Sequence, residues 1–368
     1  MSIIKRDIAI IGINILVLLI LSLLVIKHLA PGLLGLPQDL ILVQEDKQVA
    51  PFYENVFAYN DSDDYLISDP HTLVRATPLV DRYDNAGPND LLGFRNLSVP
   101  NSADVIFIGD SQTYGNNAPF EYTIPSYSES ILRKISNNRV YSMATGGWGA
   151  LQYYYMAQKA LSFSPKVLVI CFYSGNDPME SFALAYGDER WLEFRPDAKL
   201  NASDMPSAPE ESAWGVVFEN GSRTIFTPHR RYISVNDHPV ADAGWQILKK
   251  VATKISGIGR ENDVHVIFTI IPTKELVYAQ KLDAENFDIP THYQQQITAE
   301  LHRIKDFEKH LQAVQGAHYV PVWESLQQAA FGDEPLYPPN SDGHPLPHGY
   351  FVVANALAPT LHRLLDVQ

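Results

Sequence analysis

Four short segments of this sequence carry the residue types that acyl transfer requires. They supply a serine, a run of glycines, an asparagine and an aspartate–histidine pair, in the segments 109–115 (GDSQTYG), 145–149 (TGGWG), 174–177 (SGND) and 341–345 (SDGHP). A serine nucleophile needs a base for its proton, preordered donors for the oxyanion, and a group that holds the imidazole in one tautomer. Together the four segments contain all of these groups.

Each segment alone has an ordinary structural explanation. A Gly-Asp-Ser sequence can be a turn, and the glycines 146, 147 and 149 are common turn residues. An isolated Asn176 can bond its own backbone at a strand end, and His344 beside Pro345 can be a loop histidine. The chemical interpretation depends on finding all four segments in one chain, each at the end of an expected strand or before the last helix.

Apolar runs alternate with amphipathic stretches from residue 104 onward. We predict buried strands at 104–109, 140–143, 167–173, 264–271 and 318–322, and helices at 122–138, 150–163, 240–260, 293–315 and 347–364. Strands that alternate with helices at this spacing predict a parallel sheet covered on both faces, an α/β/α sandwich. In such sheets reactive groups collect at the carboxyl ends of the strands, so the four segments should converge there.

The order and spacing of these segments resemble the SGNH (GDSL-type) hydrolase superfamily over roughly residues 90–364. The similar blocks are DLLGFRN, VIFIGDSQTYG, GGWGALQYY, VICFYSGND and SDGHPLPHGY. The resemblance implies a flavodoxin-like α/β/α fold and assigns roles to five residues. Ser111 would be the nucleophile and an oxyanion donor, Gly147 and Asn176 further donors, His344 the base, and Asp342 the group that orients it.

Two details of the resemblance are less regular. Gly147 is preferred over the neighbouring glycines because SMATGGWG resembles the family pattern N-x-G-x-x-G-x-G. The family usually places its aspartate three residues before the histidine, where this chain has Ser341; if the segment is extended, Asp342 still faces the same way as His344. Alginate-type O-acetyltransferases of the superfamily also carry D-x-H, ahead of their nucleophile, and their sequence resembles 271–278 (IPTKELVY).

Composition excludes several classes of protein. Lys and Arg number 28 against 42 Asp and Glu, a net charge of −14, which opposes nucleic-acid binding. A hydrophobic content of 46% excludes a disordered chain, and the single Cys171 excludes disulfides and cysteine-cluster zinc sites. We expect no metal, because prolines between His344 and His348 oppose the helix that a histidine pair of that spacing needs. The sequence has no phosphate loop, and we expect no cofactor.

Residues 8–26 contain no charge and predict a membrane-spanning helix. A helix of this length covers about 28 Å, close to the ~30 Å hydrocarbon core. A cleaved signal peptide is the alternative, although it usually has a shorter apolar core and a small-residue cleavage site. Lys5 and Arg6 against Lys27 favour a cytoplasmic N-terminus in the inner membrane, with the acidic bulk periplasmic or extracellular.

The expected organisation is an anchor at 1–30, a stalk and irregular lead-in at 31–100, and the hydrolase-like domain at 101–368. Residues 180–240 break the strand–helix rhythm and predict an insertion. Aromatic and basic side chains in this insertion and after the second strand have two interpretations, the lining of a substrate groove or ordinary packing. They are Trp148, Tyr153, Tyr154, Tyr155, Trp191, Trp214, Arg195, His229, Arg230 and Arg231.

The favoured hypothesis is a membrane-anchored serine esterase or O-acetyltransferase that acts on an envelope or secreted polysaccharide. The two activities share every step up to the acyl-enzyme, and transfer would imply a membrane protein that donates the acyl group. The alternatives are a non-catalytic polysaccharide-binding or scaffold subunit, and a lipase or thioesterase with an apolar acyl channel.

Overall fold

The computed structural model describes residues 66–80, 87–134, 137–206, 213–227, 231 and 233–366. The expected anchor at 8–26 and much of the expected stalk lie outside these ranges. Within them, no helix combines the length and apolar character needed to cross a bilayer.

A five-stranded parallel sheet forms the centre of the described structure. Its order is β4 (Val140–Ala144), β3 (Val105–Gly109), β5 (Val167–Tyr173), β8 (His265–Ile271) and β9 (Ala317–Val320). In the register, Ile108 of β3 lies between Met143 of β4 and Ile170 of β5. Every residue of β3 and β5 is buried, which explains why these strands are continuous apolar runs rather than alternating ones.

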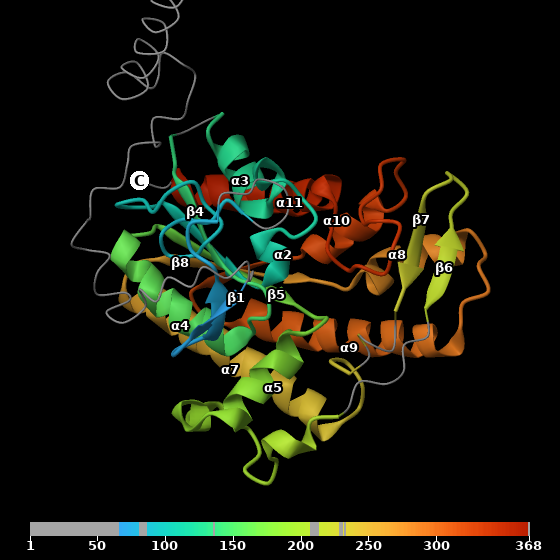
Figure 1. The fold of residues 1–368 in the computed structure, drawn as a ribbon, viewed down its shortest axis with the longest axis horizontal. Coiled ribbons are helices and arrows are strands. Elements are labelled where there is room, and N and C mark those ends of the chain that lie inside the picture. The colour runs from blue at the N-terminus through green and yellow to red at the C-terminus, as the bar shows by residue number, and fades with distance from the viewer. Residues whose placement is uncertain are drawn as a thin grey trace, which may run out of the picture. The chain divides into compact units, whose positions relative to one another are not determined.

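Helices cover both faces of the sheet (Figure 1). One layer contains α3 (Ile124–Leu132), α10 (Val322–Ala329) and α11 (Pro347–Leu365), and the other contains α4 (Ala150–Ala160), α7 (Pro239–Glu261) and α9 (Thr291–Ala313). Alternate residues of β5 face the two layers. Cys171 belongs to the core shared with α11, whereas the ring of Phe172 contacts Tyr153 of α4 and Phe307 of α9.

Smaller elements surround this sandwich. Two antiparallel hairpins are formed by β1 (Leu66–Asp69) with β2 (Leu73–Ala76) and by β6 (Trp214–Val217) with β7 (Arg223–Phe226). The short helices are α2 (Ser111–Tyr114), α5 (Asp177–Gly187) and α8 (Lys274–Ala284), with 3₁₀ turns at Phe120–Tyr122, Leu161–Phe163, Glu189–Phe194 and Ala202–Asp204. The expected insertion at 180–240 thus contains most of α5, two 3₁₀ turns and the β6–β7 hairpin.

The predicted α/β/α architecture is confirmed by this arrangement. Numbered along the chain, the strands of the sheet follow the order 2-1-3-4-5, so the winding direction reverses between β3 and β5. Open sheets of this order bind ligands at that reversal, outside the carboxyl ends of the strands. Ser111 follows β3 and Asn176 follows β5, at this point of the fold.

Candidate active site

Ser111 is the first residue of α2 and follows directly on the tight turn that leaves β3. Asp110 caps α2, because its carboxylate accepts a hydrogen bond from the amide of Gln112 at 2.9 Å. A Cβ on Gly109 would lie 2.1 Å from the Thr113 hydroxyl, so only glycine lets α2 fold back so closely on the strand. Gly115 ends α2 at φ +90°, in the left-handed region that favours glycine. The GDSQTYG motif is thus the turn that presents Ser111.

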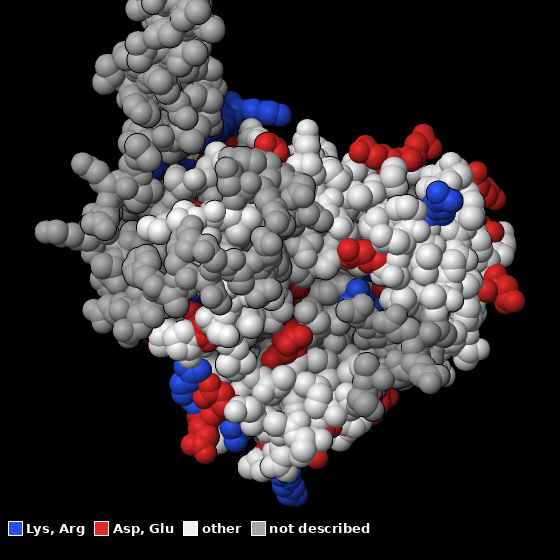
Figure 2. Space-filling model, viewed as in Figure 1, with Lys and Arg blue, Asp and Glu red and all other residues white. Residues whose placement is uncertain are grey.

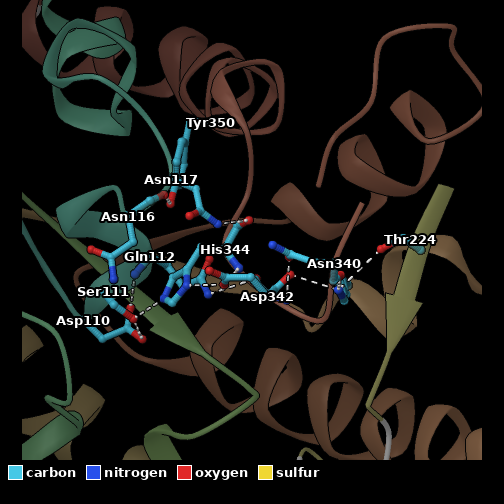
Figure 3. Close-up of polar contacts among 12 residues, drawn as sticks. Asp110, Ser111, Gln112, Asn116, Asn117, Thr224, Asn340, Asp342, His344 and Tyr350 are labelled. Atoms are coloured by element: carbon cyan, nitrogen blue, oxygen red, sulfur yellow. Dashed lines mark hydrogen bonds and ion pairs between the residues drawn. The ribbon is translucent and has the colours of Figure 1, made fainter. Parts of the chain in front are cut away.

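The structure brings Ser111, His344 and Asp342 into one hydrogen-bonded chain (Figure 3). His344 Nε2 lies 2.8 Å from Ser111 Oγ, and His344 Nδ1 lies 2.6 Å from Asp342 Oδ1. The serine and the histidine are 233 positions apart in the sequence, and the fold places them in contact. One imidazole nitrogen is thus available to take the serine proton, while the other is held by a carboxylate.

Asp342 reaches the imidazole through a turn rather than an extended segment. Its Oδ1 also accepts the backbone amide of His344 at 3.0 Å, which is the hydrogen bond of an Asx turn. The Asp342 amide in turn donates to Asn340 Oδ1 at 2.9 Å. Burial of the Asp342 carboxyl works against its ionisation, but the hydrogen bonds from His344 and the charge of that imidazole outweigh it and hold the pKa below its ordinary value.

The segment that carries Ser111 also donates hydrogen bonds to the loop that carries His344. Gln112 Nε2 donates to the carbonyl of Gly343, and Asn117 Nδ2 donates to the carbonyl of His344, each at 3.3 Å. The Tyr350 hydroxyl of α11 donates to the carbonyl of Asn116 at 2.6 Å. These contacts fix the relative position of nucleophile and base.

A buried lysine holds the other side of this loop, and the sequence analysis did not identify it. Lys274 begins α8 and is 1% exposed. Its Nζ donates to the carbonyls of Asn340 and Asp342, at 2.8 and 2.9 Å, and lies 3.4 Å from the Thr224 hydroxyl of β7. Burial lowers the pKa of Lys274 to about 8. The sequence signals were its place just after a predicted strand and its position within 271–278 (IPTKELVY), and neither assigned it a role.

A buried glutamate on α9 ties together the ends of two sheet strands. Glu300 accepts hydrogen bonds from Ser174 Oγ, from the amide and hydroxyl of Thr273, and from Gln296 Nε2, at 2.6 to 3.0 Å. It therefore fixes the segments that lead to Asn176 and Lys274. Burial raises the pKa of Glu300 despite these donors.

Ser111, His344 and Asp342 line a pocket of about 500 Å³. Its lining contains no aliphatic side chain: Ser111, Gln112, Tyr173, Asn176, Arg231, Asn340, Ser341, Asp342 and His344. In Figure 2 the surface is hollowed between the α2 and β7 sides, with acidic and basic atoms near the hollow. The Asn176 side chain makes no hydrogen bond within the described ranges, and its Oδ1 is buried, so its amide group remains available to a ligand.

Gly147 is the one predicted site residue that does not line this pocket. It follows β4 at the same edge of the sheet, is exposed, and has φ +76°. A Cβ there would meet no atom within 4 Å, so the left-handed backbone rather than crowding explains the glycine. Its amide makes no hydrogen bond to the part of the chain that the structure describes.

The remaining candidates have mainly structural positions. Trp148 and Tyr153 are fully buried, as is Asp110, whose pKa burial raises to about 6. Asp177 accepts the Tyr153 hydroxyl and the Tyr173 amide, each at 2.9 Å. Of the aromatic and basic residues weighed in the insertion, Arg231 alone of those described lines the pocket; His229 and Arg230 lie outside the described residues.

Comparison with known proteins finds similar solved structures but no similar sequence. No family model matches the chain, and no curated protein matches it. Similar structures include TesA (13% identity, 71% of this chain, 98% of that chain, TM-score 0.39) and a member of the lipolytic G-D-S-L family from Veillonella parvula DSM 2008 (11%, 70%, 98%, 0.38). The acetylxylan esterase Axe2 from Geobacillus stearothermophilus is another (9%, 72%, 95%, 0.39).

Proposed function

We propose that this chain, which has the fold of the SGNH hydrolase superfamily, is a serine acyl-ester hydrolase that forms an acyl-enzyme on Ser111. The observation that carries the proposal is the contact of Ser111 Oγ with His344 Nε2 at 2.8 Å, with Asp342 2.6 Å from the opposite ring nitrogen. Asp342, with its lowered pKa, is ionised at neutral pH and stabilises the imidazolium that forms when the serine proton is taken.

The reaction follows from these positions. His344 Nε2 accepts the Ser111 proton as Oγ bonds to the ester carbonyl carbon, and the carbonyl oxygen becomes an oxyanion. The Ser111 amide and the Asn176 side chain are the donors proposed for it, with Gly147 as a third. Collapse breaks the bond to the alcohol, whose oxygen takes the proton from Nε2. Water, or a sugar hydroxyl in the transferase variant, then attacks the acyl-enzyme and regenerates Ser111.

The polar lining of the pocket favours a small acyl group on a polar alcohol. Long acyl chains need apolar walls, because hydrophobic burial supplies most of their binding free energy, whereas every lining side chain here carries a polar atom. We therefore propose O-acetyl esters on an envelope or secreted polysaccharide as substrates. A lipase or thioesterase that takes long acyl chains would require a pocket lined by apolar side chains.

Replacing the nucleophile tests the proposed activity. Ser111→Ala should lower hydrolysis of 4-nitrophenyl acetate and acetylated oligosaccharides on the order of 10³-fold or more, with unchanged thermal unfolding. A fluorophosphonate probe should label the native wild type but neither this variant nor heat-denatured protein. Ser162→Ala, which removes an exposed hydroxyl from another part of the chain, is the matched control. Full activity in Ser111→Ala would contradict the assignment of Ser111 as the nucleophile, whereas no labelling and no hydrolysis by the wild type would support the non-catalytic scaffold.

Residues 8–26 are proposed as an uncleaved anchor that keeps the catalytic domain on the outer side of the inner membrane. The absence of charge over 19 residues supports this, and an acyl-donating membrane protein is the partner that transfer would need. In a bacterial host the chain should remain in the membrane after carbonate extraction, and protease added to spheroplasts should degrade the domain. A mature N-terminus near residue 30 would instead show a cleaved signal peptide.

A further inference from the structure

Two cationic side chains lie at the pocket, and they differ in what they contact. Lys274 Nζ is surrounded by three oxygens of the protein, from Asn340, Asp342 and Thr224. Arg231 lines the pocket, yet no hydrogen bond or ion pair to the described part of the chain holds its guanidinium. The donors of Lys274 are therefore committed to the loop, whereas those of Arg231 are open to a ligand.

The carboxylates around Arg231 do not use its donors. Asp342 is hydrogen-bonded to His344, Glu300 accepts from four donors, and Glu275 accepts the amide of Thr227 at 3.0 Å. None of the three forms an ion pair with Arg231 in the described structure. Their negative charges favour a cation at this place, but they leave the guanidinium N–H groups without a partner among them. Those N–H groups lie in one plane and can donate two parallel hydrogen bonds to a carboxylate or a phosphate.

Arg231 lies on the side of the pocket from which the alcohol leaves. Its Nη2 packs against Gly343, where a Cβ would lie 2.5 Å away, and Gly343 directly precedes His344. The base that protonates the leaving oxygen must be next to that oxygen. A group that reaches Arg231 while the ester is at Ser111 therefore belongs to the alcohol, not to the acyl chain.

We infer that Arg231 is a specificity-determining residue that binds an anionic group, a carboxylate or a phosphate, on the alcohol part of the substrate. The inference rests on the proposed ester hydrolysis and narrows its substrate to acylated acidic sugars. Arg231 and Ser111 line the same pocket, so in a chain with a net charge of −14 this guanidinium gives such a substrate a positive partner near the reacting serine.

The test compares sugars that differ only in the anionic group, with full-length protein in detergent. Mono-O-acetylated methyl galactoside, methyl galacturonoside and methyl galactoside 6-phosphate are assayed for kcat/KM by acetate release, and their deacetylated forms for affinity by calorimetry. We expect the wild type to favour at least one anionic sugar about 10- to 100-fold over the neutral one in both measurements. The uronoside and phosphate arms show which anion is preferred.

Variants at Arg231 decide the residue's role. Arg231→Gln should bring the anionic-to-neutral ratio close to one, and Arg231→Lys should keep part of it, because the charge remains without the fork. Arg260→Gln, on α7 and not in the pocket lining, is the control whose ratio should equal that of the wild type. A wild type without preference, or an unchanged ratio in Arg231→Gln, would overturn the inference.

Two further outcomes separate this inference from the proposed activity. Affinity for the anionic sugars that depends on Arg231, without any acetate release, would support the binding role and contradict the hydrolase. Acetate release at equal rates from neutral and anionic sugars would support the hydrolase and contradict the binding role of Arg231. A preference for 4-nitrophenyl hemisuccinate over the acetate that Arg231→Gln removes would place the anion on the acyl side and contradict the assignment to the alcohol.

Discussion

At the scale of single residues, Asp342 shows how a departure in spacing is accommodated. The sequence places it two positions before His344 rather than three, and an extended segment was expected to bring the two side chains together. The structure uses an Asx turn instead, in which one carboxylate oxygen accepts both the backbone amide and Nδ1 of His344. The short spacing and the contact with the ring are therefore parts of the same turn.

Asp342→Asn should disable the site while leaving the fold in place. The amide can still accept from the backbone, but it cannot stabilise a positively charged imidazole, and it can select the wrong tautomer. We expect kcat for ester hydrolysis to fall by about 10²- to 10⁴-fold. Asp333→Asn, which removes an exposed carboxylate from the preceding loop, is the control. Wild-type kinetics in Asp342→Asn would mean that His344 is oriented by another group.

The sequence predicts residues that belong to a motif and misses those that act from a distance. Ser111, Asn176 and His344 each occur in a recognisable segment at a predicted strand end, and the structure brings all three to one pocket. Lys274 and Glu300 contact the site only because α8 and α9 pack against it. No local pattern distinguishes a buried Glu300 from the solvated carboxylates of a charged amphipathic helix.

At the scale of elements, α8 links the β6–β7 hairpin to the loop that carries Asp342 and His344. Lys274, the first residue of α8, contacts Thr224 of β7 and two carbonyls of that loop. The position of His344 thus depends on an element that contains none of the residues in the four motifs.

Lys274→Met should impair catalysis more than stability alone explains. The aliphatic part of the side chain is kept, but two loop carbonyls lose a charged donor, so the loop is held less firmly and fewer molecules have His344 aligned with Ser111. We expect kcat to fall about tenfold or more, with a smaller change in KM, well below the unfolding temperature. Lys281→Met, another buried lysine of α8, should lower the melting temperature without a comparable loss of kcat. Equal effects of the two variants on kcat would contradict this positioning role.

The predictability of an element depends on how regular its burial is. The strands β5 and β8 and the helix α7 are long and follow simple patterns, and they were predicted to within about two residues. Helix α8 was missed because it buries Lys274, Glu275 and Lys281 together with its apolar residues, which hides the helical period. The hairpins β1–β2 and β6–β7 have strands of only four residues, too short for a clear alternation.

At the scale of the whole molecule, the charge balance is shaped by carboxyl groups inside the fold. Burial raises the pKa of Asp90 and of Asp110 to about 6, and it also raises the pKa values of Asp177 and Glu300. These groups resist ionisation in the folded state but ionise near pH 4 in the unfolded chain. Folding therefore carries a cost at neutral pH that is absent in mild acid.

The free energy of unfolding should consequently fall as the pH rises from about 4 to 7. Between the unfolded and folded pKa values the folded protein holds more protons, so raising the pH favours unfolding, by at most about 3 kcal/mol for each of Asp90 and Asp110. Below about pH 4 the sign reverses, because Asp342 and Asp306 have lowered pKa values and lose their stabilising charge. Urea unfolding at pH 5 and pH 7 measures the difference. Asp110→Asn keeps the oxygen that caps α2 and should flatten the pH dependence of stability. The control Asp333→Asn, at an exposed position, should leave that dependence unchanged. A wild-type stability that increases from pH 5 to 7 would show that the buried carboxyls are ionised at little cost in the folded protein.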